Sequence, residues 1–195
     1  MSAVVVGLDV GHLDERQADH DLRELGQALP AGAVRWAATH WATLGERPHV
    51  ALSVELVGLP STELPALLAG WLEQRWPAWS SASEEGVRGA AALQDTAVAA
   101  RDAHVLRRTG RLVRYPGADA LVGTLTVQQL LDRSDVDRVR VLAAGDAGSD
   151  VDVVTRSHVR PVWADGELVL LTQPAAGGTL VPFESPAPTV CCADH

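Results

Sequence analysis

The residues with the clearest chemical potential lie in the C-terminal sequence PAPTVCCADH. Cys191 and Cys192 are the only cysteines of the chain, and His195 follows three residues after the second. Thiolate sulfur and imidazole nitrogen are preferred zinc ligands, and the Cys-x-x-His spacing lets two side chains reach one ion from a single turn. Adjacent side chains of an extended chain point to opposite sides, so Cys191 joins the same ion only where the backbone turns. The tail therefore predicts part of a site for zinc or another soft transition metal.

This tail is too short to complete a tetrahedral site by itself. The missing ligand is Asp194, the terminal carboxylate, His158 from the preceding β-rich part, or the tail of a second subunit. The alternative is a chain end without a function, because disorder concentrates at termini. We take Cys191, Cys192, His195 and His158 as the candidate metal ligands.

A second group of candidates could support acid–base chemistry. Asp9 and His12 stand at the end of the first predicted strand, where a carboxylate and an imidazole can form a general acid/base pair. No nucleophile or orienting third group accompanies them, so a solvated loop is the favoured interpretation. His40 is predicted to lie on an apolar face, as a hydrogen-bonded core residue. The run Asp19-His20-Asp21 is interpreted as surface charge on a helix, and the catalytic residues of any enzyme stay unknown.

The tryptophans offer a third interpretation. The chain has six tryptophans but one phenylalanine and one tyrosine. Most are expected in the core, where large rings fill volume. The alternative is an aromatic patch for a homo-oligomer or a protein partner, because tryptophan is enriched at interfaces.

Charge and composition narrow the class of protein. The 195 residues include 25 acidic and 16 basic side chains, for a formal charge of −9, which argues against a nucleic-acid binder. The N-terminus lacks the basic segment of a secretory signal, and no apolar run reaches the ~20 residues that span a bilayer. We expect a cytoplasmic protein without membrane contact, in which paired cysteines are thiols or metal ligands rather than a disulfide.

Hydrophobic patterns predict the elements that position these residues. Residues 3–10 alternate as a strand, and a helix capped by Asp14 follows up to Pro30. Two further strands around residues 33–44 and 49–58 form a hairpin, and a helix capped by Ser61 or Thr62 ends at Pro77. The order strand, helix, strand, strand, helix predicts a ferredoxin-like lobe.

The hairpin has two possible registers. One places Trp36, Ala38, His40 and Ala42 opposite the apolar residues Val50, Leu52, Val54 and Leu56. The other, one residue away, places Arg35, Ala37, Thr39 and Trp41 there. The first register is preferred because it joins the two apolar faces.

The rest of the chain is interpreted as a helix within 80–108, introduced by a linker, and then a strand-rich region. That region includes a short helix with a Thr126–Gln129 capping box and a hairpin turn at Asp165-Gly166. The predicted class is α+β. Its parts are a ferredoxin-like βαββα lobe (1–80), a helical connector (81–110), a β-rich part packed on the first lobe (111–184) and a Cys/His arm (185–195).

The sequence favours a metal-binding accessory protein that uses the Cys-Cys-x-x-His tail. The alternative is a non-enzymatic oligomeric or partner-binding subunit with an incidental tail. A small enzyme with an Asp/His site is the least favoured hypothesis.

Overall fold

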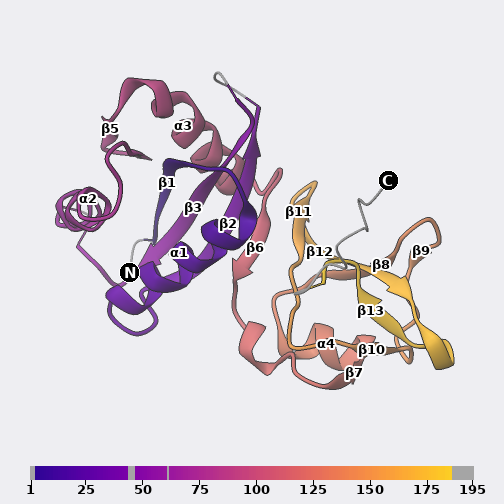
Figure 1. The fold of residues 1–195 in the computed structure, drawn as a ribbon. Helices are drawn as coiled ribbons and strands as arrows, with labels where there is room; N and C mark the ends of the chain where they lie inside the picture. The colour runs from indigo at the N-terminus through magenta and orange to yellow at the C-terminus, as the bar shows by residue number, and fades with distance from the viewer. Residues whose placement is uncertain (1–2, 44–46, 61, 186–195) are drawn as a thin grey trace. The chain divides into compact units, whose positions relative to one another are not determined.

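The structure, a computed structural model, describes residues 3–43, 47–60 and 62–185. The chain has the expected α+β composition, with four α-helices and a mixed set of strands among these residues (Figure 1). It divides into two compact units. The first comprises residues 1–116 and 163–166, and the second comprises 117–162 and 167–195. The four-part division expected from the sequence stays a prediction.

The first unit is an antiparallel sheet with helices on both faces. Its strands follow the order β5-β4-β1-β3-β2-β6, and every neighbouring pair is antiparallel. The elements are β1 (Ala3–His12), α1 (Glu15–Ala28), β2 (Val34–Ala42), β3 (His49–Val57), α2 (Leu64–Glu73), β4 (Ser80–Ser83), β5 (Gly86–Gly89), α3 (Ala91–Val105) and β6 (Arg111–Arg114). The chain returns to this unit at Trp163, whose N–H donates to the Gly110 carbonyl at 2.9 Å.

Helices α1 and α2 cover one face of this sheet and α3 covers the other (Figure 1). The apolar core lies under α1 and α2, where buried leucines such as Leu25 and Leu68 meet Leu8 and Leu52 of the strands. On the opposite face α3 approaches β1 so closely that a Cβ on Gly7 would overlap the Ala97 carbonyl. Glycine at this position is what allows the helix to pack there.

The preferred hairpin register is wrong. Trp41 lies opposite Val50, and Thr39 lies opposite Leu52, which is the alternative register. The pairing shifts between Val34 and Trp36, so a bulge at residue 35 returns Val34 to a position opposite Leu56. His40 consequently faces α3 and Ser53 instead of the apolar core. The sheet face under α3 accepts polar side chains, because α3 supplies hydrogen-bond partners for them.

Helix boundaries agree with the sequence in part. Asp14 caps α1 by accepting a hydrogen bond from the Gln17 N–H at 2.9 Å, as expected. Helix α2 begins at Leu64 with Glu63 as its N-cap residue, so Thr62 does not cap it, and Ser61 lies outside the described residues. Residues 80–89, expected to be linker and helix, form the β4–β5 hairpin.

The second unit is a small mixed sheet with one short helix. Its strands follow the order β9-β8-β12-β13-β10-β7, with parallel pairs at β8–β12 and β10–β13. The elements are η1 (Ala118–Ala120), β7 (Thr124–Thr126), α4 (Val127–Arg133), β8 (Arg138–Val141), β9 (Gly145–Asp146), β10 (Asp152–Val154), β12 (Glu167–Pro174), η2 (Ala176–Gly178) and β13 (Leu180–Pro182), with β11 (Val162–Ala164) beside the Asp165-Gly166 turn. The Thr126–Gln129 capping box is confirmed. In the described part of the chain, no helix has the length and apolarity to span a membrane.

Candidate metal centre

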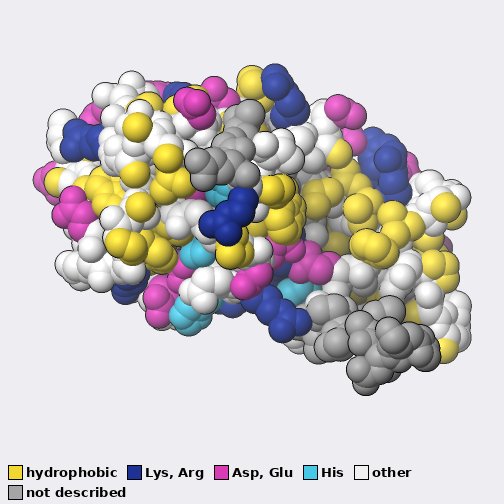
Figure 2. Space-filling model, turned by 45° about the horizontal axis from the view of Figure 1, so that its top comes forward, with side chains coloured by type: hydrophobic (Ala, Val, Ile, Leu, Met, Phe, Trp, Pro, Cys, Tyr) yellow, Lys and Arg dark blue, Asp and Glu magenta, His cyan; other side chains and the backbone are white. Residues whose placement is uncertain are grey.

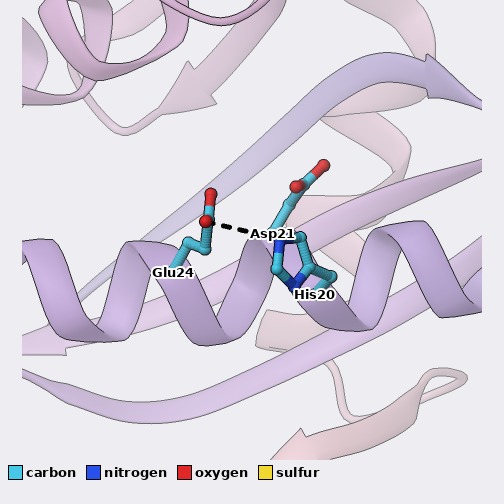
Figure 3. Close-up of side chains that lie close together, drawn as sticks. All are labelled: His20, Asp21 and Glu24. Carbon is cyan, nitrogen blue, oxygen red and sulfur yellow. Dashed lines mark ion pairs between the residues drawn. The ribbon is translucent and has the colours of Figure 1, made fainter.

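Three potential metal ligands project from one surface of α1. His20, Asp21 and Glu24 each offer one nitrogen or oxygen atom, and these atoms lie within 4.8 Å of one another. Figure 3 shows the three side chains leaving the same helix, with an ion pair between His20 and Glu24. His20 and Glu24 are four residues apart, so they stand on consecutive turns of the same face, and His20 Nε2 lies 3.3 Å from Glu24 Oε1.

A bulge at the end of β1 brings a histidine, His12, beside one member of this group, Asp21. Regular pairing would place Val10 opposite Val50, but the register shifts after Leu8 and places His12 there instead. Gly11 has a φ of +73°, which glycine adopts readily, and its N–H donates to Asp9 Oδ1 at 2.8 Å. The bulge therefore turns His12 toward α1, where its Nε2 lies 2.9 Å from Asp21 Oδ2.

The contact between His12 and Asp21 is not a hydrogen bond. Both side chains are only 4% exposed, and neither contacting atom has a hydrogen-bond partner among the described residues, although the two atoms form an ion-pair contact at 2.9 Å. Two atoms that each lie ~2.1 Å from one ion are separated by about 3.0–3.4 Å for angles from 90° to tetrahedral. Distances of 2.9 Å for His12–Asp21 and 3.3 Å for His20–Glu24 fit that separation.

Neighbouring side chains hold the two carboxylates in place. The Gln17 amide donates to Asp21 Oδ1 at 3.1 Å, which leaves Oδ2 free to face His12. Arg75 Nε lies 3.6 Å from Glu24 Oε2, the oxygen that does not face His20. The edge of the Trp76 ring packs at 88° to the His12 imidazole, with 6.0 Å between centroids. Contacts of this kind orient metal ligands in many sites.

The electrostatics favour a neutral imidazole at the buried end of the cluster. Burial lowers the pKa of His12, against the attraction of Asp21, Asp9 and Asp14. Burial also raises the pKa of Asp21, against the influence of His12 and the Gln17 hydrogen bond. Only a neutral imidazole has a lone pair for a metal, and a divalent cation would offset the charges of Asp21 and Glu24.

Asp9 and His12, which sequence analysis considered as an acid/base pair, belong to different contacts. Asp9 is fully buried and accepts hydrogen bonds from the Thr96 hydroxyl and from His49 Nε2, the latter at 2.8 Å. His49 donates its other nitrogen to the Arg47 carbonyl at 2.9 Å. The solvated-loop interpretation of Asp9 and His12 is therefore wrong, since both are buried.

His40 takes part in a buried chain of hydrogen bonds. The Ser53 hydroxyl lies 2.7 Å from His40 Nε2 and 2.7 Å from His104 Nδ1, linking β2, β3 and α3. Burial lowers the pKa of His40 to about 4, and burial together with His40 and Arg107 lowers that of His104 to about 3. Trp163 packs edge-on against His104, with 4.5 Å between centroids. These neutral histidines serve packing and hydrogen bonding, as expected for His40.

Cys191, Cys192 and His195 lie outside the described residues. His158 is described, and its Nε2 pairs with Glu184 Oε1 at 2.9 Å within the second unit.

The cluster on α1 was not predicted from the sequence. The run Asp19-His20-Asp21 was expected to be surface charge, but only His20 is exposed, and Asp19 and Asp21 are 4% and 3% exposed. Asp19 forms a bidentate pair with Arg111, at 2.6 and 3.1 Å, and Arg111 is 92 residues away in sequence. The spacing of His20 and Glu24 is the one signal that could have pointed to ligands, because i, i+4 pairs bind metal on helices.

The tryptophans divide between the core and the surface. Trp36 and Trp163 are buried and pack together with 5.8 Å between ring centroids, whereas Trp41 is 61% exposed. Trp71, Trp76 and Trp79 are partly buried against the core. On the face drawn in Figure 2, hydrophobic side chains reach the surface between charged groups, and histidines occur among them.

Comparisons with protein-family models, curated proteins and solved structures find no match to this chain. Its function is therefore argued from its own side chains.

Proposed function

We propose that this protein binds a divalent transition metal ion, with zinc as the favoured ion, through His12, His20, Asp21 and Glu24. The observation that carries the proposal is the pair of buried atoms His12 Nε2 and Asp21 Oδ2, which lie 2.9 Å apart and make no hydrogen bond. A buried polar atom without a hydrogen bond is costly, and a shared cation would satisfy both. Two nitrogens and two carboxylate oxygens suit zinc and neighbouring divalent metals.

The scaffold of this site is, we infer, a ferredoxin-like βαββαβ unit made of β1, α1, β2, β3, α2 and β4. The antiparallel order β4-β1-β3-β2, with α1 and α2 on one face, supports this inference. In this fold α1 directly follows β1, so the end of the strand and the second turn of the helix are natural neighbours. That proximity supports a shared site for His12 and Asp21.

The Cys191-Cys192-x-x-His195 tail remains a second metal-site proposal, with His158 as its possible partner. Its soft thiolates would suit zinc or a softer metal. In that case the protein is an accessory that holds metal at two chemically different places, one of nitrogen and oxygen and one of sulfur and nitrogen.

The test is calorimetric titration of Zn²⁺ into the full chain, purified without a histidine tag and treated with a chelator. The first variant is His20→Ala/Glu24→Gln, which changes side chains that are 58% and 39% exposed and should leave the fold intact. We expect zinc affinity to fall at least about tenfold, since loss of even indirect metal support costs that much. Gln27→Ala, on the exposed side of α1, is the matched control and should bind normally.

The second variant, Cys191→Ser/Cys192→Ser, separates the two sites. Loss of affinity in this variant alone would assign the metal to the tail and overturn the α1 site. Absorption of the Co²⁺-loaded protein adds an independent signal, because only thiolate ligands give intense sulfur-to-cobalt charge-transfer bands. If neither the wild type nor any variant binds Zn²⁺ in these titrations, both sites are refuted.

Exposed apolar groups favour a partner-binding role as the second candidate. Leu13 and Trp41 are 65% and 61% exposed and line one depression beside the start of α1, where the Trp41 indole donates to Glu15 at 2.6 Å. Exposed tryptophan anchored by a hydrogen bond is typical of interaction surfaces. Light scattering on the wild type and Trp41→Ser measures whether the chain self-associates through this surface; a monomer in both cases would remove the homo-oligomer.

A further inference from the structure

The β4–β5 hairpin and α2 enclose a cavity that shares no residue with the metal centre. Its volume is about 160 Å³. Four aliphatic side chains form its floor: Val4 and Val6 of β1, and Leu64 and Leu68 of α2. Val6, Leu64 and Leu68 are each at most 3% exposed, so the floor is part of the apolar core. An empty space of this size next to aliphatic groups can hold a small organic molecule.

A serine that is largely buried lines this space. Ser81 of β4 lines the cavity and is 9% exposed, and its side chain makes no hydrogen bond within the described part of the chain. Ser80, its neighbour on the other face of the strand, is fully buried and donates to the Arg88 carbonyl at 2.9 Å. The hydroxyl of Ser81 is therefore open to the cavity, where it can form a hydrogen bond with a polar atom of a ligand.

The rim of the cavity has a net negative charge. Glu84 and Glu85 at the tip of the hairpin and Arg88 on β5 are its charged groups, and all three are exposed. Among the described residues none of the three forms an ion pair with another side chain, so their charges are available to a ligand. Two carboxylates against one guanidinium favour a cationic group at the mouth.

We propose that this cavity binds a small aliphatic ammonium compound. The branched or straight hydrocarbon part, about five carbons long, lies on Val4, Val6, Leu64 and Leu68. The ammonium group lies at the rim, where it donates to Ser81 and interacts with Glu84 and Glu85. This proposal is independent of the metal site.

The experiment titrates the full-length ¹⁵N-labelled protein with three compounds that share the 3-methylbutyl group and differ in charge. They are 3-methylbutylammonium, the neutral 3-methylbutan-1-ol and the anionic 4-methylpentanoate. We expect amide shifts in β4, β5 and α2, with affinity in the order ammonium, alcohol, carboxylate. Glu84→Gln/Glu85→Gln should weaken ammonium binding about three- to tenfold, as expected for two exposed carboxylates, and leave alcohol binding unchanged.

Two further variants connect the effect to the cavity. Val4→Phe fills the space from a partly exposed position and should abolish binding of all three compounds, while Val87→Phe on the outer side of the same hairpin should not. Glu73→Gln, an exposed glutamate of α2 outside the rim, is the charge control. Equal or tighter binding of 4-methylpentanoate, unchanged affinity in Val4→Phe with an intact fold, or no shifts at all would each overturn the proposal.

Discussion

The buried chain His40–Ser53–His104 makes the first unit sensitive to acid. In the folded protein the pKa values of the two histidines are about 4 and about 3, against 6.5 for the exposed side chain. A histidine whose pKa is lowered by folding contributes stability above its unfolded pKa, and this stability is lost as the pH falls below 6.5. Between pH 7 and pH 4.5 each histidine therefore removes ~2.5 kcal/mol of unfolding free energy, or about 5 kcal/mol together.

A loss of this size is comparable to the whole stability of many domains. The assay is urea unfolding at pH 7.0, 5.5 and 4.5, followed by tryptophan fluorescence in the presence of a chelator. All six tryptophans belong to the first unit, so this signal reports on that unit. The variant His40→Gln/His104→Asn replaces the two bonding nitrogens, His40 Nε2 and His104 Nδ1, with amides that do not titrate.

We expect the wild type to lose about 5 kcal/mol more than this double variant between pH 7.0 and 4.5. Each single variant, His40→Gln or His104→Asn, should lose about half as much extra unfolding free energy as the wild type over this pH range. His20→Gln is the control, because its side chain is 58% exposed, and it should follow the wild type. If the double variant and the wild type lose the same free energy over this range, the two histidines do not remain neutral in the folded protein.

Two further predictions concern the same face of the sheet, and a third, on α2 at the opposite face, serves as a comparison. Burial lowers the pKa of His49, but hydrogen bonds to the Arg47 carbonyl and to Asp9, together with the charge of Asp9, raise it overall. The His49–Asp9 contact therefore stabilises the folded protein fully below pH 6.5, and this stabilisation is lost as the pH rises through the folded pKa of His49. Asp9→Asn should cost about 3–5 kcal/mol at pH 6 in the same urea assay, as breaking a buried pair does, and a cost below about 1 kcal/mol would mean that the pair is not charged. Gly7→Ala should lower the free energy of unfolding by about 1–3 kcal/mol or more. Its Cβ would overlap the Ala97 carbonyl of α3 and lie 2.8 Å from the backbone nitrogen of Arg101. Gly70→Ala in α2, where a Cβ has no atom within 4 Å, should instead stabilise by up to ~1 kcal/mol, and equal effects at both positions would contradict the packing argument.

Local chemistry explains which elements could be predicted. Asp14 and Thr126 cap their helices as expected because each hydrogen bond is made within three residues. The hairpin register was missed because the sequence offered two faces, and only α3, which begins at Ala91, makes the polar face suitable for burial. The bulge at residue 35 compounds the difficulty, since nothing local to Arg35 signals an extra residue.

The candidate site was missed for a related reason. His12 reaches Asp21 only because β1 bulges between Leu8 and His12, and strict alternation would have put Val10 in that position. Burial of Asp19 depends on Arg111, which no local pattern connects to it. Helical periodicity indicated which residues of α1 lie on the apolar side, but it could not indicate which acids would find partners at the edge of that side.

The return of the chain at Trp163 affects how this protein can be divided experimentally. The first unit is discontinuous, since residues 163–166 belong to it while the segments on either side belong to the second unit. A fragment ending at residue 116 would lack the indole that packs on Trp36 and His104, leaving exposed two surfaces that are 3% accessible in the whole chain. Proteolytic removal of the C-terminal half would therefore damage the fold of the N-terminal half.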